Sequence, residues 1–487
     1  MTNFNLHDLV LLLPEDFLLG AVCTILLVDL FLKPGQRGVT HWLSLFALLG
    51  TGAVILADTN PDTIAFSGAY VHDHVAMILK LFILGVSAAV LVFGRGYLRA
   101  RQLDIGEFYL LILFCVLGML LLVSAGNLVM VYLGLELYAL SSYGLVAINR
   151  DSGVSSEAAM KYFVLGALAS GLLLYGMSMI YGATGTLDLV AIHKTAALAA
   201  AGRSSHDVMI LFGVVFMVVG IGFKFGAAPF HMWMPDVYQG SPTAVTMFIG
   251  SAPKIAAFGM AYRLLVGGLA PAHAHWGEMI AALAALSLGI GNVVAIAQTN
   301  LKRMLAYSTI SHVGYLLVGF ANGTPLGFAA SMFYAISYAV MTTAAFGMIL
   351  LLARAGFEAE EIDDFKGLNQ RNPWYAFIML LTMASLAGIP PLFGFFAKLL
   401  VLQAAISANM YWLAGVAIVF AIIGAFYYLR VIKVMYFDAP TDGTVLALPK
   451  DLPLRWLLSI NGLALLILGL YWGPLIGWCY RAFGLAS

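Results

Sequence analysis

Long apolar stretches separated by short polar segments recur along the whole chain. A window of about 20 residues, the length that crosses a bilayer as a helix, finds approximately fourteen of them. They lie near residues 9–32, 41–57, 75–94, 107–123, 127–148, 157–181, 208–230, 242–266, 276–297, 301–320, 326–353, 374–403, 409–432 and 454–475. The pattern predicts an all-α, polytopic membrane protein of about 14 transmembrane helices.

The composition supports a bilayer as the solvent. Hydrophobic residues make up 62% of the 487 residues and charged residues only 10%, whereas a soluble domain carries about 25% charged residues. The formal net charge is zero and the basic residues are scattered. This pattern excludes a nucleic-acid-binding protein, which would concentrate positive charge on one surface.

Lysine and arginine are divided unevenly between alternate loops. Retained positive charge marks the cytoplasmic side of a membrane protein. The loops after the first, third, fifth, ninth, eleventh and thirteenth spans carry Lys33, Arg37, Arg95, Arg99, Arg101, Arg150, Lys302, Arg303, Arg354, Lys366, Arg371, Arg430, Lys433, Lys450 and Arg455. The other loops carry only Lys194, Arg203, Arg263 and Arg481. We therefore expect both termini on the outer side of the membrane.

The middle of the chain divides into two blocks of similar length with five spans each, spans 4–8 and spans 9–13. An odd number of spans inverts the second copy relative to the first. We therefore predict two inverted five-helix repeats between two flanking segments. The predicted segments are an N-terminal three-helix segment (1–106), the first repeat (107–266), the second repeat (267–437) and a C-terminal helix (438–487).

Each block contains one span with helix breakers inside it. These are Gly-Phe-Lys-Phe-Gly-Ala-Ala-Pro at 222–229 and Gly-Ile-Pro-Pro-Leu-Phe-Gly at 388–394. Proline removes a backbone donor and glycine tolerates unusual angles, so we predict two broken helices. The membrane permits such breaks only where protein or water satisfies the freed groups. Paired broken helices in inverted repeats indicate an ion pathway near the midplane, with a packing kink as the alternative.

Ionisable side chains lie inside several predicted spans. Such a charge costs roughly 3 kcal/mol on insertion scales, so it persists where a hydrated interior receives it. Burial lowers the pKa of a lysine by as much as about 3 to 5 units, which brings proton release within reach of neutral pH. A buried lysine is therefore a candidate proton carrier. The candidates are Lys80, Lys161, Lys224, Lys254, Lys398 and Glu136.

The alternatives differ between these positions. Lys224 and Lys398 lie beside the two breaks, and Lys254 directly follows Pro253. Lys161 lies near the start of its span, where its ammonium can instead reach the membrane surface. Lys80 lies outside both repeats, and an ion pair with an acidic neighbour explains it equally well.

Two further residues complete the predicted relay. Glu136 would be held ionised by a nearby ammonium, and Lys161 is the expected partner because a short loop joins their spans. The charge state of each would then depend on the other. His312 has an unperturbed pKa near neutrality and is a natural bridge between lysines, with a structural histidine as the alternative.

Two sequence motifs resemble a known family. One is Phe-His-Met-Trp-Met-Pro-Asp-Val-Tyr-Gln-Gly-Ser-Pro-Thr at 230–243, followed by Pro253 and Lys254, and the other is Leu-Lys-Arg-Met-Leu-Ala-Tyr-Ser-Thr-Ile-Ser-His at 301–312. They resemble the signatures of the proton-translocating, antiporter-like subunits of respiratory complex I, and the similarity covers essentially the whole chain. Of the three large subunits, one usually has a glutamate where Lys398 stands and another has a long lateral helix after the last span, so the third matches best.

This resemblance implies a function. Glu136, Lys161, Lys224, Lys254 and Lys398 match the family's central polar axis, whereas Lys80 matches no relay position. The chain would form one proton channel in a bacterial inner membrane, driven by electron transfer from NADH to quinone in other subunits. It would bind no cofactor itself, with FMN and iron-sulfur clusters in partner subunits. Its partners would be the other membrane subunits of complex I and the lipid bilayer.

The expected cycle begins with Glu136 and Lys161 pairing or separating, which promotes proton release from Lys224 through His312 or Lys254 toward Lys398. The sequence also shows no phosphate-binding glycine loop, haem ligand pair, cysteine cluster or nucleophile triad, so redox chemistry is expected elsewhere. The alternative function is a subunit of a multisubunit sodium/proton antiporter or membrane-bound hydrogenase. A stand-alone solute transporter is a third class, which the lysine-rich spans disfavour.

Overall fold

The computed structural model describes residues 6–57, 62–201, 207–353, 357–440 and 451–486. Arg203, Arg354 and Lys450, which entered the loop comparison, lie outside the described residues. The first half of the chain contains α1 (Leu6–Leu11), α2 (Leu13–Leu30), η1 (Pro34–Gln36), α3 (Gly38–Ala57), β1 (Thr63–Ala65), η2 (Phe66–Gly68), β2 (Tyr70–His72), α4 (His74–Ala100), α5 (Gly106–Val123), α6 (Leu128–Val146), α7 (Gly153–Thr184), α8 (Leu189–Ala200), α9 (Asp207–Phe225) and α10 (Trp233–Gly240).

The second half continues with helices on both sides of the second break. They are α11 (Thr243–Gly250), α12 (Ala252–Ala261), the π-helix η3 (Tyr262–Gly268), η4 (Ala270–Ala272), α13 (His273–Ile296), α14 (Leu301–Ala321), α15 (Pro325–Leu352), η5 (Ile362–Phe365), α16 (Leu368–Arg371), α17 (Pro373–Ala387), α18 (Phe393–Ser407), α19 (Tyr411–Tyr436), α20 (Leu452–Leu470) and α21 (Gly473–Ala482).

Every predicted span contains helix, interrupted in two of them at the predicted breaks. Among the described residues, 12 helical stretches are long and apolar enough to cross a membrane. The two other predicted spans are α2, whose window holds Glu15, Asp16 and Asp29, and the broken pair α17 and α18. The all-α, multi-span fold is confirmed. The inverted relation of the two five-helix repeats and the segment boundaries stay predictions.

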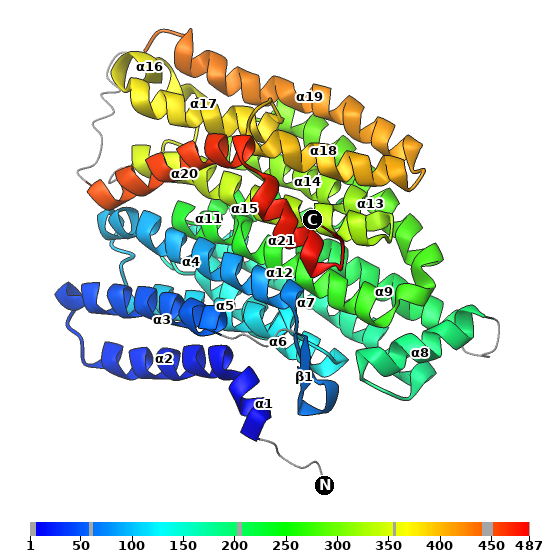
Figure 1. The fold of residues 1–487 in the computed structure, drawn as a ribbon. Helices are drawn as coiled ribbons and strands as arrows, with labels where there is room; N and C mark the ends of the chain where they lie inside the picture. Colours follow the sequence, from blue (N-terminus) through cyan, green and yellow to red (C-terminus); the bar gives the residue numbers. More distant parts are fainter. Residues whose placement is uncertain (1–5, 58–61, 202–206, 354–356, 441–450, 487) are drawn as a thin grey trace.

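The long helices run side by side in one bundle (Figure 1). The chain passes from α2 and α3 at one edge, through α4 to α15 in the middle, to α17, α18 and α19 at the opposite edge. α20 then returns and packs against α4, α15 and α17. The last long helix therefore joins the N-terminal helices to the second half of the molecule.

One end of the bundle holds both termini. The antiparallel hairpin of β1 and β2 lies there, and the carboxylate of Asp8 accepts a hydrogen bond from the backbone of Phe66 at 3.0 Å. The ring of Phe483, just after α21, lies 5.2 Å from that of Tyr262. Tyr262 adjoins Arg263, which pairs with Asp73 at the start of α4. The two termini thus share one side, as an even number of spans requires.

The opposite end of the bundle collects basic residues that are held by acidic ones. Arg101 after α4 pairs with Glu358, and Arg303 in α14 pairs with Asp236 at 2.8 Å. The carboxylate of Glu358 also accepts a hydrogen bond from the hydroxyl of Tyr97 at 2.9 Å. The ammonium of Lys302 in α14 lies 3.9 Å from the same carboxylate, so the segment that contains Glu358 is fixed against the ends of α4 and α14.

The chain leaves the helical conformation at both predicted breaks. α9 ends at Phe225 and α10 begins at Trp233, whereas α17 ends at Ala387 and α18 begins at Phe393. A glycine with positive φ follows each first half, Gly226 with φ 75° and Gly388 with φ 86°. Both positions need glycine because an L side chain is strained there. The two broken helices are confirmed.

Protein groups satisfy the backbone that each break frees. In the first break, the backbone N–H of Ala228 donates to the hydroxyl of Ser287 at 2.8 Å. In the second, the backbone N–H of Gly394 donates to the hydroxyl of Ser385 at 3.0 Å. These bonds explain how non-helical backbone persists at this depth, since in a bilayer an unsatisfied peptide group costs several kcal/mol.

Candidate functional site

The lysines beside the breaks lie in the interior of the bundle. Lys224, Lys254 and Lys398 are 4%, 1% and 9% exposed. His312 is also buried, in the middle of α14. Each of these groups belongs to a different helix, so the fold brings together charges that are far apart in the sequence.

Lys254 lies against the first break. Ser251 has non-helical angles and separates α11 from α12, and Lys254 lies in the first turn of α12. Its ammonium donates to the carbonyl of Phe225, the last residue of α9, at 3.0 Å. The ring of Trp233, the first residue of α10, lies 5.2 Å from the ammonium nitrogen. A freed carbonyl and an aromatic face thus hold this ammonium, and no carboxylate of the described residues bonds to it.

Lys398 is held in the same way at the second break. Its ammonium donates to the carbonyls of Leu386 and Ala387 at 3.1 and 2.8 Å, at the end of α17. The ring of Tyr315 lies 4.9 Å from the nitrogen. A Cβ at Gly388 would lie 2.8 Å from the Cδ of Lys398. The glycine that ends α17 therefore also makes room for the lysine side chain.

Lys224 lies in the last turn of α9 and has a different environment. Its Nζ makes no hydrogen bond within the described part of the chain. The rings of Tyr138 and Tyr143 lie 5.5 and 5.9 Å from it, and the charge of Glu136 interacts with it. Lys224 is the least constrained of the interior lysines, so its ammonium has freedom to change partners.

Stacked aromatic rings lie between the surroundings of Lys224 and those of Lys254. Tyr143, beside Lys224, packs edge to face against Tyr162 with ring centroids 4.7 Å apart. Tyr162 stacks on Trp233, beside Lys254, at 4.6 Å. The two ammonium groups thus share one aromatic wall.

Glu136 and Lys161 do not form the predicted pair. Glu136 accepts a hydrogen bond from Ser170 of α7. Lys161, whose side chain is 43% exposed, pairs instead with Glu157 at 2.8 Å and Asp236 at 2.7 Å. Nine residues separate Lys161 from Ser170, which is about 14 Å along a helix. The prediction of a direct pair is wrong because Lys161 lies nearer the start of α7 than Ser170, the residue at the level of Glu136.

Asp236 is a site residue that the sequence reasoning missed. It lies in α10 and bridges Lys161 of α7 and Arg303 of α14, at 2.7 and 2.8 Å. Burial raises the pKa of Asp236, but the bonds from Lys161 and Arg303 outweigh it and hold the pKa below its usual value. The signal was present, because Asp236 is the only acidic residue of the motif at 230–243.

His312 is bonded on both ring nitrogens by tyrosines. Nδ1 lies 2.7 Å from the hydroxyl of Tyr334 in α15, and Nε2 lies 3.0 Å from that of Tyr428 in α19. The hydroxyl of Tyr428 also bonds that of Ser308, one turn along α14. The charge of Lys398 acts on the imidazole. The sequence places many tyrosines in the predicted spans, but only the packing of the helices shows that Tyr334 and Tyr428 bond His312.

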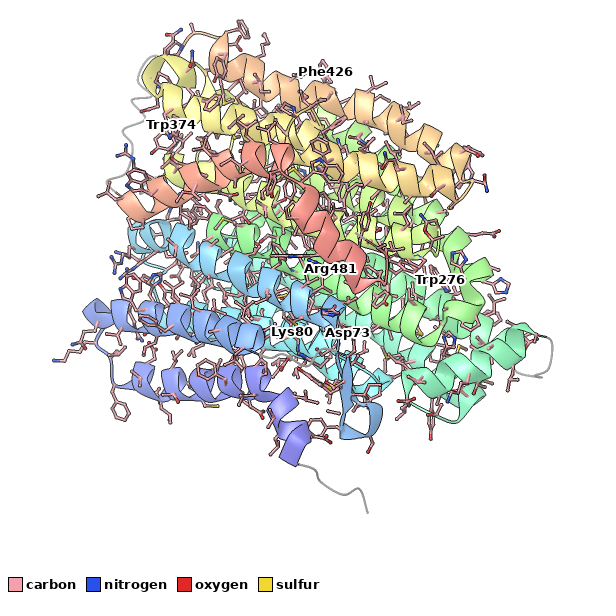
Figure 2. All side chains as sticks on the ribbon, in the orientation of Figure 1. Asp73, Lys80, Trp276, Trp374, Phe426 and Arg481 are labelled. Atoms are coloured by element: carbon pink, nitrogen blue, oxygen red, sulfur yellow. The ribbon has the colours of Figure 1, made fainter. Side chains whose placement is uncertain are left out.

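Lys80 lies in a separate cluster, near the end of the bundle that holds the termini (Figure 2). Its ammonium lies 2.6 Å from the carboxylate of Glu15 in α2 and donates to the hydroxyl of Tyr70 at 2.7 Å. The bidentate ion pair of Arg263 with Asp73 lies nearby, with bonds of 2.6 and 2.7 Å. Lys80 thus forms an ion pair with an acidic neighbour, Glu15, which was the alternative to a place in the relay.

The described residues contain no group of three or more histidine, cysteine, aspartate or glutamate side chains placed to hold a metal ion. The groups of this candidate site are lysines, His312, Glu136, Asp236, hydroxyls and freed carbonyls. These groups can bind protons and exchange them with one another.

The sequence matches a family model described as NADH:quinone oxidoreductase/Mrp antiporter, TM, over residues 125–424. Similar curated proteins include the NADH-quinone oxidoreductase subunit N of Xanthomonas euvesicatoria pv. vesicatoria, 55% identical over 98% of this chain and 97% of that protein. Another is the protein of the same name from Thioalkalivibrio sulfidiphilus, 51% identical over 97% of this chain and 98% of that protein.

Solved structures of similar fold include a chain of respiratory complex I from Thermus thermophilus with bound aureothin. It is 32% identical, with a TM-score of 0.81 over 95% of this chain and 98% of that one. A chain of the Mrp complex from Dietzia sp. DQ12-45-1b has a TM-score of 0.80 over 99% of this chain and 97% of that one. At 21% identity this second likeness concerns the fold alone.

Proposed function

The chain belongs to the transmembrane family shared by NADH:quinone oxidoreductases and Mrp antiporters, and on that premise we propose that it moves protons as subunit N of a bacterial NADH:quinone oxidoreductase. Identity of 51 to 55% with proteins of that name, over 97 to 98% of the chain, supports this assignment. The oxidation of NADH and the reduction of quinone would then occur on partner subunits that carry FMN and iron-sulfur clusters.

One observation carries the proposal that this chain conducts protons. Two buried ammonium groups, those of Lys254 and Lys398, are each bonded to the carbonyls that a broken helix frees, with no carboxylate as their hydrogen-bond partner among the described residues. Desolvation without a counter-charge weakens the hold of an amine on its proton. The carbonyls still stabilise the charged form enough for it to be populated, so each site can be loaded and emptied.

The proposed route begins at the basic end of the bundle, where Asp236 holds the partly exposed Lys161. A proton taken up there passes to the pair of Glu136 and Lys224, whose charges interact. The uncommitted Nζ of Lys224 hands it on toward Lys254. This order replaces a direct switch between Glu136 and Lys161, because Lys161 is engaged by Asp236 and Glu157.

In the second half of the route, His312 and its tyrosines lead to Lys398. An imidazole bonded by two hydroxyls can take a proton on one nitrogen and release one from the other, provided that the hydroxyls turn. Because the charge of Lys398 acts on His312, a proton on one disfavours a proton on the other. That repulsion would drive the proton onward when Lys398 empties.

We also propose the orientation and the setting. The end of the bundle with Arg101, Lys302 and Arg303 faces the cytoplasm, since basic loops are retained there, and the shared end of the termini faces the periplasm. The chain would lie in the inner membrane beside the other membrane subunits, with no redox centre of its own.

Replacement of Lys224 by alanine in the whole complex tests this function. We expect the complex to assemble and oxidise NADH more slowly, with fewer protons pumped per electron. Lys194→Ala, an exposed lysine in α8, is the matched control and should pump normally. Normal assembly with normal protons per electron in Lys224→Ala would remove Lys224 from the relay.

Purification separates the proposed complex from the antiporter alternative. If the tagged chain comes out with flavin and iron-sulfur subunits that oxidise NADH and reduce quinone, the assignment stands. A complex that exchanges sodium for protons and contains no redox centre would overturn it, while leaving the lysine route open to the same Lys224→Ala test.

A further inference from the structure

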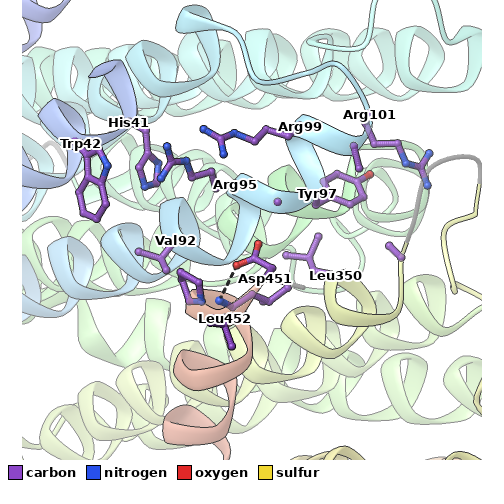
Figure 3. Close-up of a pocket in the computed structure, with 15 residues that line it drawn as sticks. His41, Trp42, Val92, Arg95, Tyr97, Arg99, Arg101, Leu350, Asp451 and Leu452 are labelled. Atoms are coloured by element: carbon purple, nitrogen blue, oxygen red, sulfur yellow. Dashed lines mark hydrogen bonds between the residues drawn. The ribbon is translucent and has the colours of Figure 1, made fainter. Parts of the chain in front are cut away.

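A cavity of about 610 Å³ opens at the basic end of the bundle, away from the buried lysines (Figure 3). Its walls are the first turn of α3, the last turns of α4, the end of α15 and the first turn of α20. The cavity therefore lies where the N-terminal helices meet the returning C-terminal helix. The proposed proton route uses none of its lining residues.

The lining of the cavity carries more positive than negative charge. Arg95, Arg99 and Arg101 line it, and Asp451 is the acidic lining residue. Arg99 is neutralised by Asp104 at 3.0 Å, and Arg101 by Glu358.

Arg95 differs from the other two arginines. In the described part of the chain its guanidinium has no ion pair, and its Nε is buried without a hydrogen-bond partner. Its guanidinium carbon lies 5.8 Å from the centre of the Trp42 ring. The carboxylate of Asp451 is occupied in part by the backbone N–H of Leu454, which it caps at 3.2 Å. Arg95 and Asp451 are thus the two lining charges without an ion pair in the described part of the chain, and the guanidinium of Arg95 is the one with an unsatisfied donor.

Two tryptophans fix the depth of the cavity relative to the membrane. Trp42 lies four residues into α3 and Trp456 four residues into α20, and both helices begin at this end. They are 53% and 69% exposed. Tryptophan concentrates at the level of the lipid head groups. Farther along the same helices the exposed side chains are purely apolar, with Phe46 on α3 and Ile460 on α20.

We propose that this cavity binds the phosphate of an anionic phospholipid through Arg95, with the acyl chains along the exposed faces of α3 and α20. A guanidinium presents paired donors that match phosphate oxygens, and basic pockets between membrane helices on the cytoplasmic side suit anionic head groups. The bound lipid joins α3 and α4 to α20, helices that lie far apart in the sequence. The site is independent of the proton route.

Photo-crosslinking of the intact complex tests this site. Wild-type complex is placed in phosphatidylcholine vesicles that contain either diazirine-bearing phosphatidylglycerol or diazirine-bearing phosphatidylcholine, and adducts on α3 and α20 are mapped by mass spectrometry. We expect the phosphatidylglycerol probe to label these helices about fivefold more, the value of one cationic contact near the membrane surface. Equal labelling by the two probes overturns the proposal, and this comparison needs no substitution.

Variants locate the effect at Arg95. Arg95→Gln should reduce phosphatidylglycerol labelling to the level of phosphatidylcholine, whereas Arg95→Lys should keep part of the preference. Arg150→Gln, an exposed arginine after α6 at the same end, should leave it unchanged. An equal loss in Arg150→Gln would indicate a diffuse surface effect and contradict the site. Loss of the labelling on adding millimolar inorganic phosphate would identify a free anion as the ligand and contradict the lipid.

Discussion

Lys80 and Lys398 are both buried in membrane helices, yet their ammonium groups have opposite surroundings. Lys80 has the carboxylate of Glu15 at 2.6 Å and the hydroxyl of Tyr70 at 2.7 Å. Lys398 has only the two carbonyls at the end of α17 as hydrogen-bond partners within the described residues. Residue type and burial are therefore shared, and the counter-charge is what differs.

The difference separates a structural lysine from a carrier. A full negative charge in contact with a buried ammonium keeps it protonated, since releasing the proton would leave the carboxylate unpaired. Carbonyl dipoles stabilise the ammonium less, so its charge can be removed when a neighbouring charge shifts. The fold thus uses an ion pair to fix α2 against α4, whereas the lysines at the breaks have no ion pair with any residue that the structure describes.

The largest effect on proton uptake should come from replacing Lys398, the proposed proton carrier at the second break. In Lys398→Met we expect proton uptake by vesicles containing the complex to slow about 100-fold, as when a positioned acid or base is lost. Lys398→Arg should fail as well, because a guanidinium keeps its charge but does not release a proton. Quenching of a ΔpH-sensitive dye during NADH oxidation measures the rate.

The control for that comparison is Lys433→Met, at the exposed end of α19, whose side chain is 66% exposed. It should pump normally. If Lys398→Arg pumped as well as wild type, titration of Lys398 would not be required and the distinction from Lys80 would fail.

The next effect concerns the ion pair between Glu15 and Lys80. Glu15→Gln leaves the Lys80 ammonium buried without its partner, so the subunit should lose about 3 to 5 kcal/mol of stability. Thermal melting of the purified complex and the yield of assembled complex measure this loss. Complex that does assemble should pump the wild-type number of protons per electron.

Two variants sharpen this result. Asp16→Asn, the exposed neighbour on α2, should have little effect, and the double variant Glu15→Gln, Lys80→Met should recover most of the lost stability. A specific pumping defect in well-assembled Glu15→Gln would instead place Lys80 in the relay.

A smaller effect is expected at Asp73, which caps α4 and pairs with Arg263. Burial raises the pKa of Asp73, but the Arg263 guanidinium outweighs it and holds the pKa below the usual value. A depressed folded pKa means that the pair stabilises the fold above pH 3.8 and loses its contribution as pH falls through the folded pKa. Asp73→Asn should therefore cost about 2 kcal/mol at neutral pH.

The pH dependence of the melting temperature tests whether the Asp73–Arg263 pair loses its stabilising contribution as the pH falls. The difference in melting temperature between wild type and Asp73→Asn should be constant from neutral pH down to about pH 5 and narrow only in stronger acid. Asp62→Asn, an exposed acid in the same loop, should behave as wild type. A difference that grew as pH fell would contradict the assignment.

The smallest effect should follow Tyr428→Phe, which removes one hydroxyl from His312. We expect proton uptake to slow about fivefold, corresponding to one neutral hydrogen bond of about 1 kcal/mol. Tyr436→Phe at the end of the same helix is the control. Unchanged uptake in Tyr428→Phe would leave Tyr334 as the hydroxyl partner that matters at His312.

Much of the fold could be predicted because membrane spans are a local property of the sequence. The fourteen apolar stretches and the breaks at 222–229 and 388–394 each depend on neighbouring residues. The buried lysines were visible for the same reason, since a charge inside an apolar run needs no partner to be recognised.

The pairing of these charges could not be predicted in the same way. Glu15 and Lys80 are 65 positions apart, and Lys161 and Asp236 are 75, so their contacts depend on which helices pack together. Glu136 and Lys161 lie on consecutive spans, yet α7 reaches the level of Glu136 only at Ser170, nine residues after Lys161. Proximity in sequence gave the wrong partner because a helix rises about 1.5 Å per residue and separates its own side chains.

The sequence by itself determined the solvent of this protein, its helices, its breaks and the residues able to carry a proton, because each follows from local hydropathy and backbone chemistry. Only the tertiary structure decided which lysine meets a carboxylate and which meets a freed carbonyl. The physical reason is that a counter-charge acts over a few ångströms, and such distances between segments remote in sequence are set by packing.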